Sequence, residues 1–229
     1  MSRSACATPL ERAYLRNRKM LGAVRHITAS NSNTLIVINT PDGAPTFESA
    51  TAINDSGLVT LDSGDVWSQA GGRQVIAPGV NSAVGVNNAG QVIGLINNKA
   101  FITAPNVGAL TLLGTLGGDF SIATGINNSG QVVGLSATAD GQTHAFVTGV
   151  NGTSLTDLET LHSVMSAGWS NLTVAAINDN GQIAGTGIIN GKQRAFFLSP
   201  IPEPATYALM LAGFGLLAFV QARRRRLAP

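Results

Sequence analysis

The sequence predicts an all-β fold made of repeated short-strand meanders, arranged like propeller blades and followed by one C-terminal transmembrane helix. Three observations support this prediction. The composition favours turns and short strands, because 27 of the 229 residues are glycine and only 11% are charged. An Asn-x-x-Gly pattern recurs four times between β-branched or other apolar residues. An uncharged, apolar run occupies residues 205–222, close to the C-terminus.

The four Asn-x-x-Gly copies have the residue types of a tight turn between two strands. Asn can bond its own backbone two residues on, and Gly adopts positive φ without a clash of a Cβ atom. We therefore expect each copy to join two short strands. The turn residues are Asn54 and Gly57, Asn87 and Gly90, Asn127 and Gly130, and Asn178 and Gly181.

An Ala-Phe pair follows each of the last three copies and starts a third strand. Its phenylalanines, Phe101, Phe146 and Phe196, are the expected repeat core, because an aromatic side chain buries on the order of 150 to 250 Å². We expect all three to be buried in equivalent places. The first copy departs from the pattern: Leu58 stands where Gln is expected, Thr60 stands where Gly is expected, and no Ala-Phe follows.

The spacing of the copies indicates stacked units. Consecutive copies begin 33, 40 and 51 residues apart, and periods of this size suit propeller blades or other β units that cannot bury their apolar faces alone. A β-solenoid or a sandwich is the alternative, because a period does not determine how the units pack. Residues 30–199 form the predicted β-repeat domain.

The third copy carries the longest motif. It runs from Leu113-Gly114-Thr115-Leu116-Gly117-Gly118 through residues 125–134 to His144-Ala145-Phe146. This motif resembles the bacterial extracellular repeats named for their His-Ala-Phe triplet, and the resemblance covers roughly residues 51–198. It implies an extracellular β-repeat domain.

The charges are distributed unevenly. Residues 1–29 contain six basic side chains and no apolar run of a secretory signal, so we expect a basic, disordered N-terminus. Between Asp42 and Glu203, four basic residues stand against 11 acidic ones. Nucleic acid is therefore not an expected partner, because its binding needs a basic surface on the folded domain.

The C-terminal region has three parts in a fixed order. Residues 200–204 contain Pro202, Glu203 and Pro204 and form an extended linker, because proline removes a backbone donor. Residues 205–222 are long enough for a helix of about 27 Å, which spans a bilayer core. Arg223, Arg224, Arg225 and Arg226 follow at once, so the basic tail of residues 223–229 is expected to stay in the cytoplasm.

These three parts together resemble the PEP-CTERM sorting signal, over residues 202–229. The resemblance implies an exosortase-type membrane protease as a partner and a Gram-negative, exopolysaccharide-producing source. It also implies a precursor held transiently in the inner membrane, and a mature protein at the cell surface or outside the cell. Exopolysaccharide is a further expected contact.

The sequence lacks the motifs of the common hydrolases. His26, His144 and His162 are the only histidines, and neither an H-E-x-x-H nor a G-x-S-x-G pattern is present. His144 takes the place of Lys99 and Arg194 in the sister copies, so we expect it to be an exposed strand-edge residue. We expect no enzyme activity, no metal site and no cofactor.

Two further functions stay open beside that of a non-enzymatic surface or matrix protein. One is a carbohydrate-binding module that holds the protein in exopolysaccharide, with Trp67 or Trp169 as a platform for a sugar ring. The other is an exported enzyme. The sequence names no ligand for either.

Overall fold

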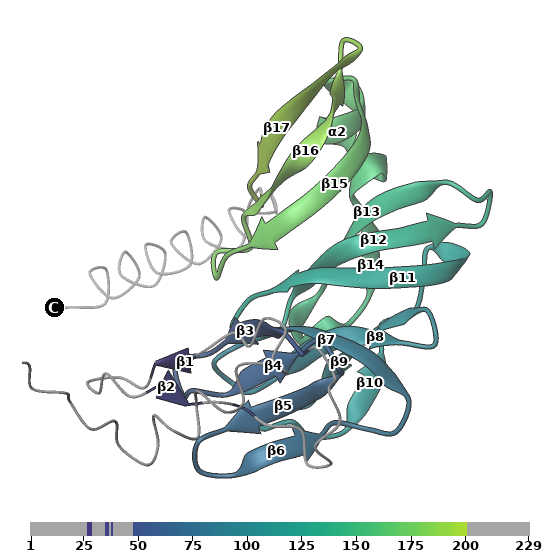
Figure 1. Cartoon of the computed structure of the whole chain (residues 1–229). Coiled ribbons are helices and arrows are strands. Elements are labelled where there is room, and N and C mark those ends of the chain that lie inside the picture. Colours follow the sequence, from purple (N-terminus) through teal and green to yellow (C-terminus); the bar gives the residue numbers. More distant parts are fainter. Residues whose placement is uncertain (1–26, 29–34, 37, 39–47, 201–229) are drawn as a thin grey trace, which may run out of the picture. The chain divides into compact units, whose positions relative to one another are not determined.

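The computed structural model describes residues 27–28, 35–36, 38 and 48–200, which are mainly antiparallel β structure (Figure 1). Residues Met1–Phe197 belong to one compact unit and Leu198–Pro229 to another. Strands β1 (Ile27–Thr28) and β2 (Leu35–Ile36) pair with each other. The predicted all-β class is confirmed for the described residues.

Four antiparallel sheets follow one another along the chain, and each is a meander of sequence neighbours. The first contains β3 (Ala50–Ile53), β4 (Val59–Leu61), β5 (Asp65–Ser68) and β6 (Gly72–Val75). The second contains β7 (Val80–Val86), β8 (Val92–Ile96), β9 (Lys99–Thr103) and β10 (Leu110–Leu112). The third contains β11 (Gly117–Ile126), β12 (Val132–Thr138), β13 (Thr143–Thr148) and β14 (Leu155–Asp157). The fourth contains β15 (Trp169–Ile177), β16 (Ile183–Ile189) and β17 (Lys192–Leu198).

Helical structure is short: one 3₁₀ turn lies between β13 and β14 of the third sheet, and the rest lies between β14 and β15. It consists of the 3₁₀ turns Val150–Gly152 and Leu158–Thr160 and helix α2 (His162–Ser166). None of the helices in the described part of the chain is long and apolar enough to cross a membrane. The predicted helix at residues 205–222 lies outside the described residues, as do Pro202, Glu203, Pro204 and the four terminal arginines.

A glycine opposite a phenylalanine recurs inside the sheets. Gly94 pairs with Phe101, and Gly134 pairs with Phe146. A Cβ atom on Gly94 would lie 2.0 Å from the carbonyl oxygen of Ser82 and 2.7 Å from the ring of Phe101. Glycine is therefore required at this position by the close approach of backbone and ring, which leaves no space for a side chain.

The strand register corrects the predicted alignment of the first copy. Ala50 pairs with Leu61 as Ala83 pairs with Gly94, so Leu61, and not Thr60, occupies the glycine position. Along the same register, Asp65 takes the phenylalanine position. Asp65 forms an ion pair with Arg73 at 2.6 Å, and Leu61 is 2% exposed. The first sheet has therefore replaced the Gly-Phe pair by a leucine and a charged residue.

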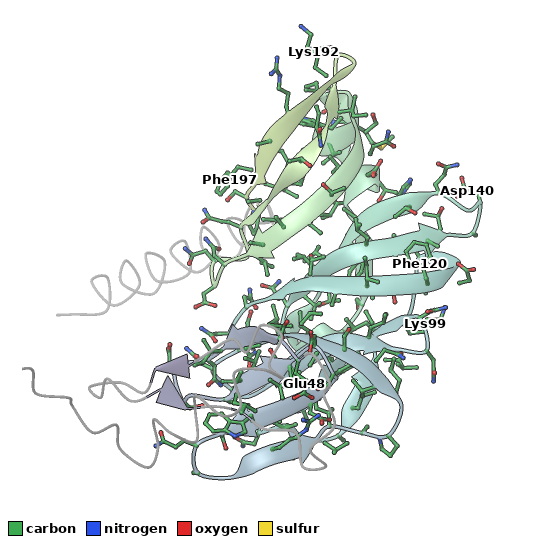
Figure 2. All side chains as sticks on the ribbon, viewed as in Figure 1. Glu48, Lys99, Phe120, Asp140, Lys192 and Phe197 are labelled. Atoms are coloured by element: carbon green, nitrogen blue, oxygen red, sulfur yellow. The ribbon has the colours of Figure 1, made fainter. Side chains whose placement is uncertain are left out.

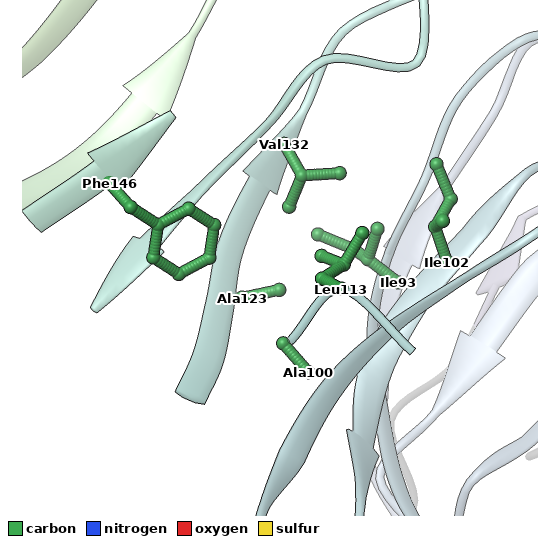
Figure 3. Close-up of a cluster of buried hydrophobic side chains, with 7 residues drawn as sticks. All are labelled: Ile93, Ala100, Ile102, Leu113, Ala123, Val132 and Phe146. Atoms are coloured by element: carbon green, nitrogen blue, oxygen red, sulfur yellow. The ribbon is translucent and has the colours of Figure 1, made fainter. Parts of the chain in front are cut away.

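The apolar core lies between consecutive sheets. Phe101 packs with Val66 of the first sheet, and the side chains around Phe146 include Ile93 and Ala100 of the second sheet. Figure 3 shows the second of these clusters, with Ala123, Val132 and Phe146 facing residues of the second sheet. Each sheet thus covers one face of the next.

Phe196 departs from the prediction of three equivalent buried phenylalanines. Phe101 and Phe146 are 0% exposed, whereas Phe196 is only half-buried and its neighbour Phe197 is 66% exposed (Figure 2). Ala195 and Phe197 lie on the face of β17 opposite to Phe196, and both are exposed. Leu110 of β10 packs against the cluster of Phe101, and Leu155 of β14 against that of Phe146. Among the described residues no such fourth strand flanks β17, so Phe196 lacks this cover.

We predict that the three phenylalanines differ in their contribution to stability. Phe101→Ala and Phe146→Ala should each lower the free energy of unfolding by about 3 to 5 kcal/mol, because each deletion leaves a cavity in a closed core. Phe196→Ala should cost less, because its site is open on one side. Urea unfolding of a chain ending at Pro200 measures all three, with Phe197→Ala as the exposed control. Equal losses at all three sites would contradict the burial pattern.

Candidate functional site

The four Asn-x-x-Gly turns are closed by the side chain of their own asparagine. In the first turn, the Oδ1 atom of Asn54 accepts hydrogen bonds from the backbone N–H groups of Ser56 at 3.1 Å and Leu58 at 2.9 Å. The backbone N–H of Gly57 donates to the carbonyl oxygen of Asn54 at 3.0 Å, and Gly57 has a φ of 78°. The same positive φ occurs at Gly90, Gly130 and Gly181. The turns therefore have the internal geometry that the residue types predict.

The same asparagines also join each turn to the turn of the next sheet, which the sequence did not suggest. The Nδ2 atom of Asn54 donates to the carbonyl oxygen of Asn87 at 2.9 Å. Asn87 donates in the same way to Asn127 at 3.0 Å, and Asn127 to Asn178 at 2.9 Å. We call this series of three inter-turn bonds the asparagine ladder. Residues 33, 40 and 51 positions apart are thus held side by side.

A second series of bonds runs beside the asparagine ladder, through the next residue of each turn. The backbone N–H of Asp55 donates to Oδ1 of Asn88 at 3.1 Å, and that of Asn88 to Oδ1 of Asn128 at 2.8 Å. The N–H of Asn128 donates to Oδ1 of Asp179 at 2.8 Å, and this bond is the main cause that lowers the pKa of Asp179. Each turn is therefore fixed to the next at two consecutive residues.

Burial follows the asparagine ladder. Asn54, Asn87 and Asn127 are 8%, 4% and 3% exposed, whereas Asn178, at the end of the series, is exposed. The amides of Asn87, Asn127 and Asn178 also donate to the glutamine four residues on. Among the described residues, no buried side-chain nitrogen or oxygen lacks a hydrogen-bond partner. The buried polar side chains of the turns thus serve the architecture of the stack.

His144 differs from the predicted exposed strand-edge residue. Its side chain is half-buried, and its Nδ1 atom lies 2.7 Å from Oδ2 of Asp157, across the pairing of β13 with β14. The hydrogen bond to Asp157 raises the pKa of His144, against a smaller opposing effect of burial. Asp157 also accepts the backbone N–H of Glu159 at 2.8 Å and so begins the following 3₁₀ turn. The pair therefore joins the edge of the third sheet to the segment that leads to the fourth.

Two other sets of residues bear on ligand binding. In the part of the chain that the structure describes, no group of three or more His, Cys, Asp or Glu side chains is placed to hold a metal ion. Trp67 and Trp169 are both half-buried. The ring of Trp169 packs edge-on against that of Phe196, with centroids 6.0 Å apart.

The described residues thus define a β-repeat protein whose sheets are joined at their turns. Comparison with known families adds one match: residues 200–226 match the family described as the PEP-CTERM protein-sorting motif. This range includes Pro202, Glu203, Pro204 and the arginines Arg223 to Arg226. The predicted sorting motif is confirmed at this level, whereas the match does not extend to the His-Ala-Phe repeats, which stay a prediction.

Among solved structures, the chain is similar to the crystal structure of TolB from Acinetobacter baumannii. The two share 14% sequence identity with a TM-score of 0.51, and the similarity covers 76% of this chain and 45% of TolB. At this identity the likeness concerns the fold alone, and this chain matches less than half of TolB. No curated protein matches the chain.

We predict that removal of one side-chain amide from the asparagine ladder lowers the free energy of unfolding. Asn127→Asp keeps the acceptor that closes the turn but removes the donor to Asn178, so it should cost about 1 to 3 kcal/mol. Asn178→Asp is the matched control, because its amide donates to Gln182 but to no further turn among the described residues. Thermal or urea unfolding measures the difference. A loss at residue 178 equal to that at residue 127 would contradict the importance of the inter-turn bond.

We predict that His144 makes stability depend on pH. Because the pKa of His144 is raised in the folded chain, its contribution is fully present below the ordinary histidine pKa of about 6.5. It is lost as the pH rises through the raised value. The urea midpoint of the natural chain should therefore exceed that of His144→Asn by more at pH 5 than at pH 8.5. The exposed His162 supplies the control, as His162→Asn, and an identical pH dependence with and without His144 would count against the pair.

Proposed function

We propose that this chain is a non-enzymatic surface or extracellular-matrix protein, sorted by an exosortase-type membrane protease. The observation that carries the proposal is the match of residues 200–226 to the PEP-CTERM protein-sorting motif. In the sequence, this motif places a Pro-Glu-Pro segment before an uncharged run and a group of arginines. Such an order suits a segment that is held in a membrane while a protease acts on the linker.

Under this proposal the precursor inserts residues 205–222 in the inner membrane, with Arg223 to Arg226 in the cytoplasm. The positive-inside rule then places residues 30–199 on the opposite side of the membrane. Removal of the motif releases the β-repeat domain to the cell surface or the medium. A propeller-like stack suits an exported structural role, because its consecutive sheets bury one another and need no cofactor to fold.

The use of polar side chains supports a structural rather than an enzymatic role. The asparagines and glutamines of the turns are engaged in hydrogen bonds within or between the turns. His144 and Asp157 are bonded to each other at the edge of the third sheet. Both sets of residues stabilise the stack of sheets.

Contact with exopolysaccharide is a second proposal, favoured by the partial exposure of Trp67 and Trp169. An aromatic ring with one accessible face offers a sugar ring an apolar surface for stacking. Trp67→Ala should abolish binding on a glycan array while circular dichroism stays unchanged. Binding that survives both Trp67→Ala and Trp169→Ala would exclude this role for the tryptophans.

We predict that the linker and the apolar run fail in different ways when they are changed. Pro202→Ala with Pro204→Ala should leave insertion intact but block processing, so an uncut precursor should accumulate in the membrane. Leu211→Arg with Leu216→Arg should abolish insertion, because each charge near the centre of a helix costs about 2.5 to 3.5 kcal/mol.

The measurement is mass spectrometry of the C-terminus after cell fractionation, in a host with the matching protease. The natural chain should be recovered from the surface fraction without its last residues. Surface material that still ends at Pro229 would exclude processing. The same fractions from a host that lacks the protease supply the control.

A further inference from the structure

The fourth sheet is incomplete at one edge. The third strand of each other sheet pairs with a fourth strand, namely β6, β10 or β14, whereas the fourth sheet ends at β17. None of the described residues pairs with the outer edge of β17. This strand is seven residues long, Lys192–Leu198, and its outer backbone donors and acceptors have no strand partner in the part of the chain that the structure describes.

The chain that follows β17 is poorly suited to fill this edge. In the second sheet the fourth strand begins seven residues after β9 ends at Thr103, and the spacing after β13 is the same. The same distance from Leu198 leads to Ala205, which lies within the matched sorting motif. Three prolines, Pro200, Pro202 and Pro204, precede this point and lack the donors that a paired strand needs.

The face of β17 that points away from the third sheet is also uncovered. On the second sheet the matching residues Ala100 and Ile102 are 0% and 3% exposed. On β17, Ala195 is exposed and Phe197 is 66% exposed, as Figure 2 shows for Phe197 on its strand. The neighbouring strands add Ala184 and Ala175, which are exposed as well. An open edge and an uncharged apolar face therefore occur on the same strand.

We propose that β17 pairs with β17 of a second copy of this chain, in antiparallel orientation about a two-fold axis at Ala195. The two fourth sheets then form one continuous sheet across the dimer. The direction is that of β14 on β13, since Phe146 pairs antiparallel with Asp157. Ala100 is the counterpart of Ala195 in the second sheet. Its N–H donates to Oγ of Ser121 and its C=O accepts from the N–H of Leu113, so both groups point away from β8. Ala195 thus presents both groups to the partner.

The charges of β17 favour this register. Lys192 and Arg194 lie in the first half of the strand, and Phe196 and Leu198 lie in the second half. Antiparallel pairing about Ala195 places Arg194 opposite the partner's Phe196, where a guanidinium can stack on an aromatic ring. Parallel pairing would place Arg194 opposite Arg194, and like charges directly opposite are destabilising.

The other end of the stack is not the expected partner surface. On the outer face of the first sheet, Val59 and Leu61 are already buried, at 1% and 2% exposure. The middle of this face is therefore already covered. Its exposed apolar side chains, Ile53 at 57% and Val75 at 62%, lie only at the ends of β3 and β6. A two-fold pairing of β17 uses a single open surface twice and forms a closed dimer.

The experiment uses the full chain in detergent, with Cys6→Ser as the background so that no natural thiol remains. Ala195→Cys should form a disulfide-linked dimer under mild oxidation, because directly opposite Cα atoms lie about 4.5 to 5.5 Å apart, within the range that a disulfide bridges. Mixing Gln193→Cys with Phe197→Cys should give the mixed dimer, in preference to either dimer with itself. This second pair keeps the test valid if Ala195→Cys fails to fold.

Ala184→Cys is the control, because it lies on the same face but on β16, away from the axis. Light scattering on the natural chain should give twice the monomer mass after subtraction of the detergent. A monomeric natural chain would overturn the proposal. So would cross-linking at Ala184 but not at Ala195, which would indicate face-to-face packing, or a mixed dimer no more abundant than the dimers of its components.

Discussion

The side-chain amide of the first turn residue does two tasks at once, and the stacking of the sheets depends on both. Its oxygen accepts the backbone N–H groups that close its own turn, and its nitrogen donates to the carbonyl of the next turn. Serine lacks the second group, and an ionised aspartate offers acceptors only, so neither meets both demands. Because the bonds that Asn54 and Asn87 donate to the next turn are buried, leaving their acceptors unpaired is costly. The asparagine ladder therefore fixes where each sheet begins relative to the last, and the apolar faces then meet in register.

The glycine-phenylalanine pairs show how the space between the sheets is filled. A phenylalanine ring lies over Gly94 and over Gly134, where any Cβ atom would clash with the ring and with the opposite backbone. In the first sheet, Leu61 occupies the glycine position and Asp65 the position of the ring. The apolar volume has thus moved from one strand to its neighbour. Such an exchange conserves the burial of the site while it removes the sequence pattern by which the unit would be recognised.

The sequence predicts the turns, which depend on residues close together in the chain. It does not predict the contacts that depend on a neighbouring strand or sheet. Asn54 and Gly57 identify a turn because both constraints lie within four residues. The donation from Asn54 to Asn87 spans 33 residues, and only the choice of asparagine in all four turns hints at it. Phe196 carries the same motif as Phe146, yet its burial depends on a fourth strand, like β14 beside β13, that its own segment does not encode. For the same reason the sequence pattern predicts an exposed His144, although Asp157 on the adjacent strand holds it.

The sorting motif is recognisable in a different way from the β-repeat domain. Pro202, Glu203 and Pro204 are recognisable because the sorting motif is a linear segment, so their order in the sequence carries the information. The β-repeat domain is recognised through contacts between segments 33 to 51 residues apart. The two requirements meet immediately after β17. At this point a complete four-stranded sheet would need a further strand with backbone donors, whereas the sorting motif contains prolines, which lack these donors. Within residues 48–200 the last sheet therefore has an open edge at β17, which a second copy with the same edge can complete.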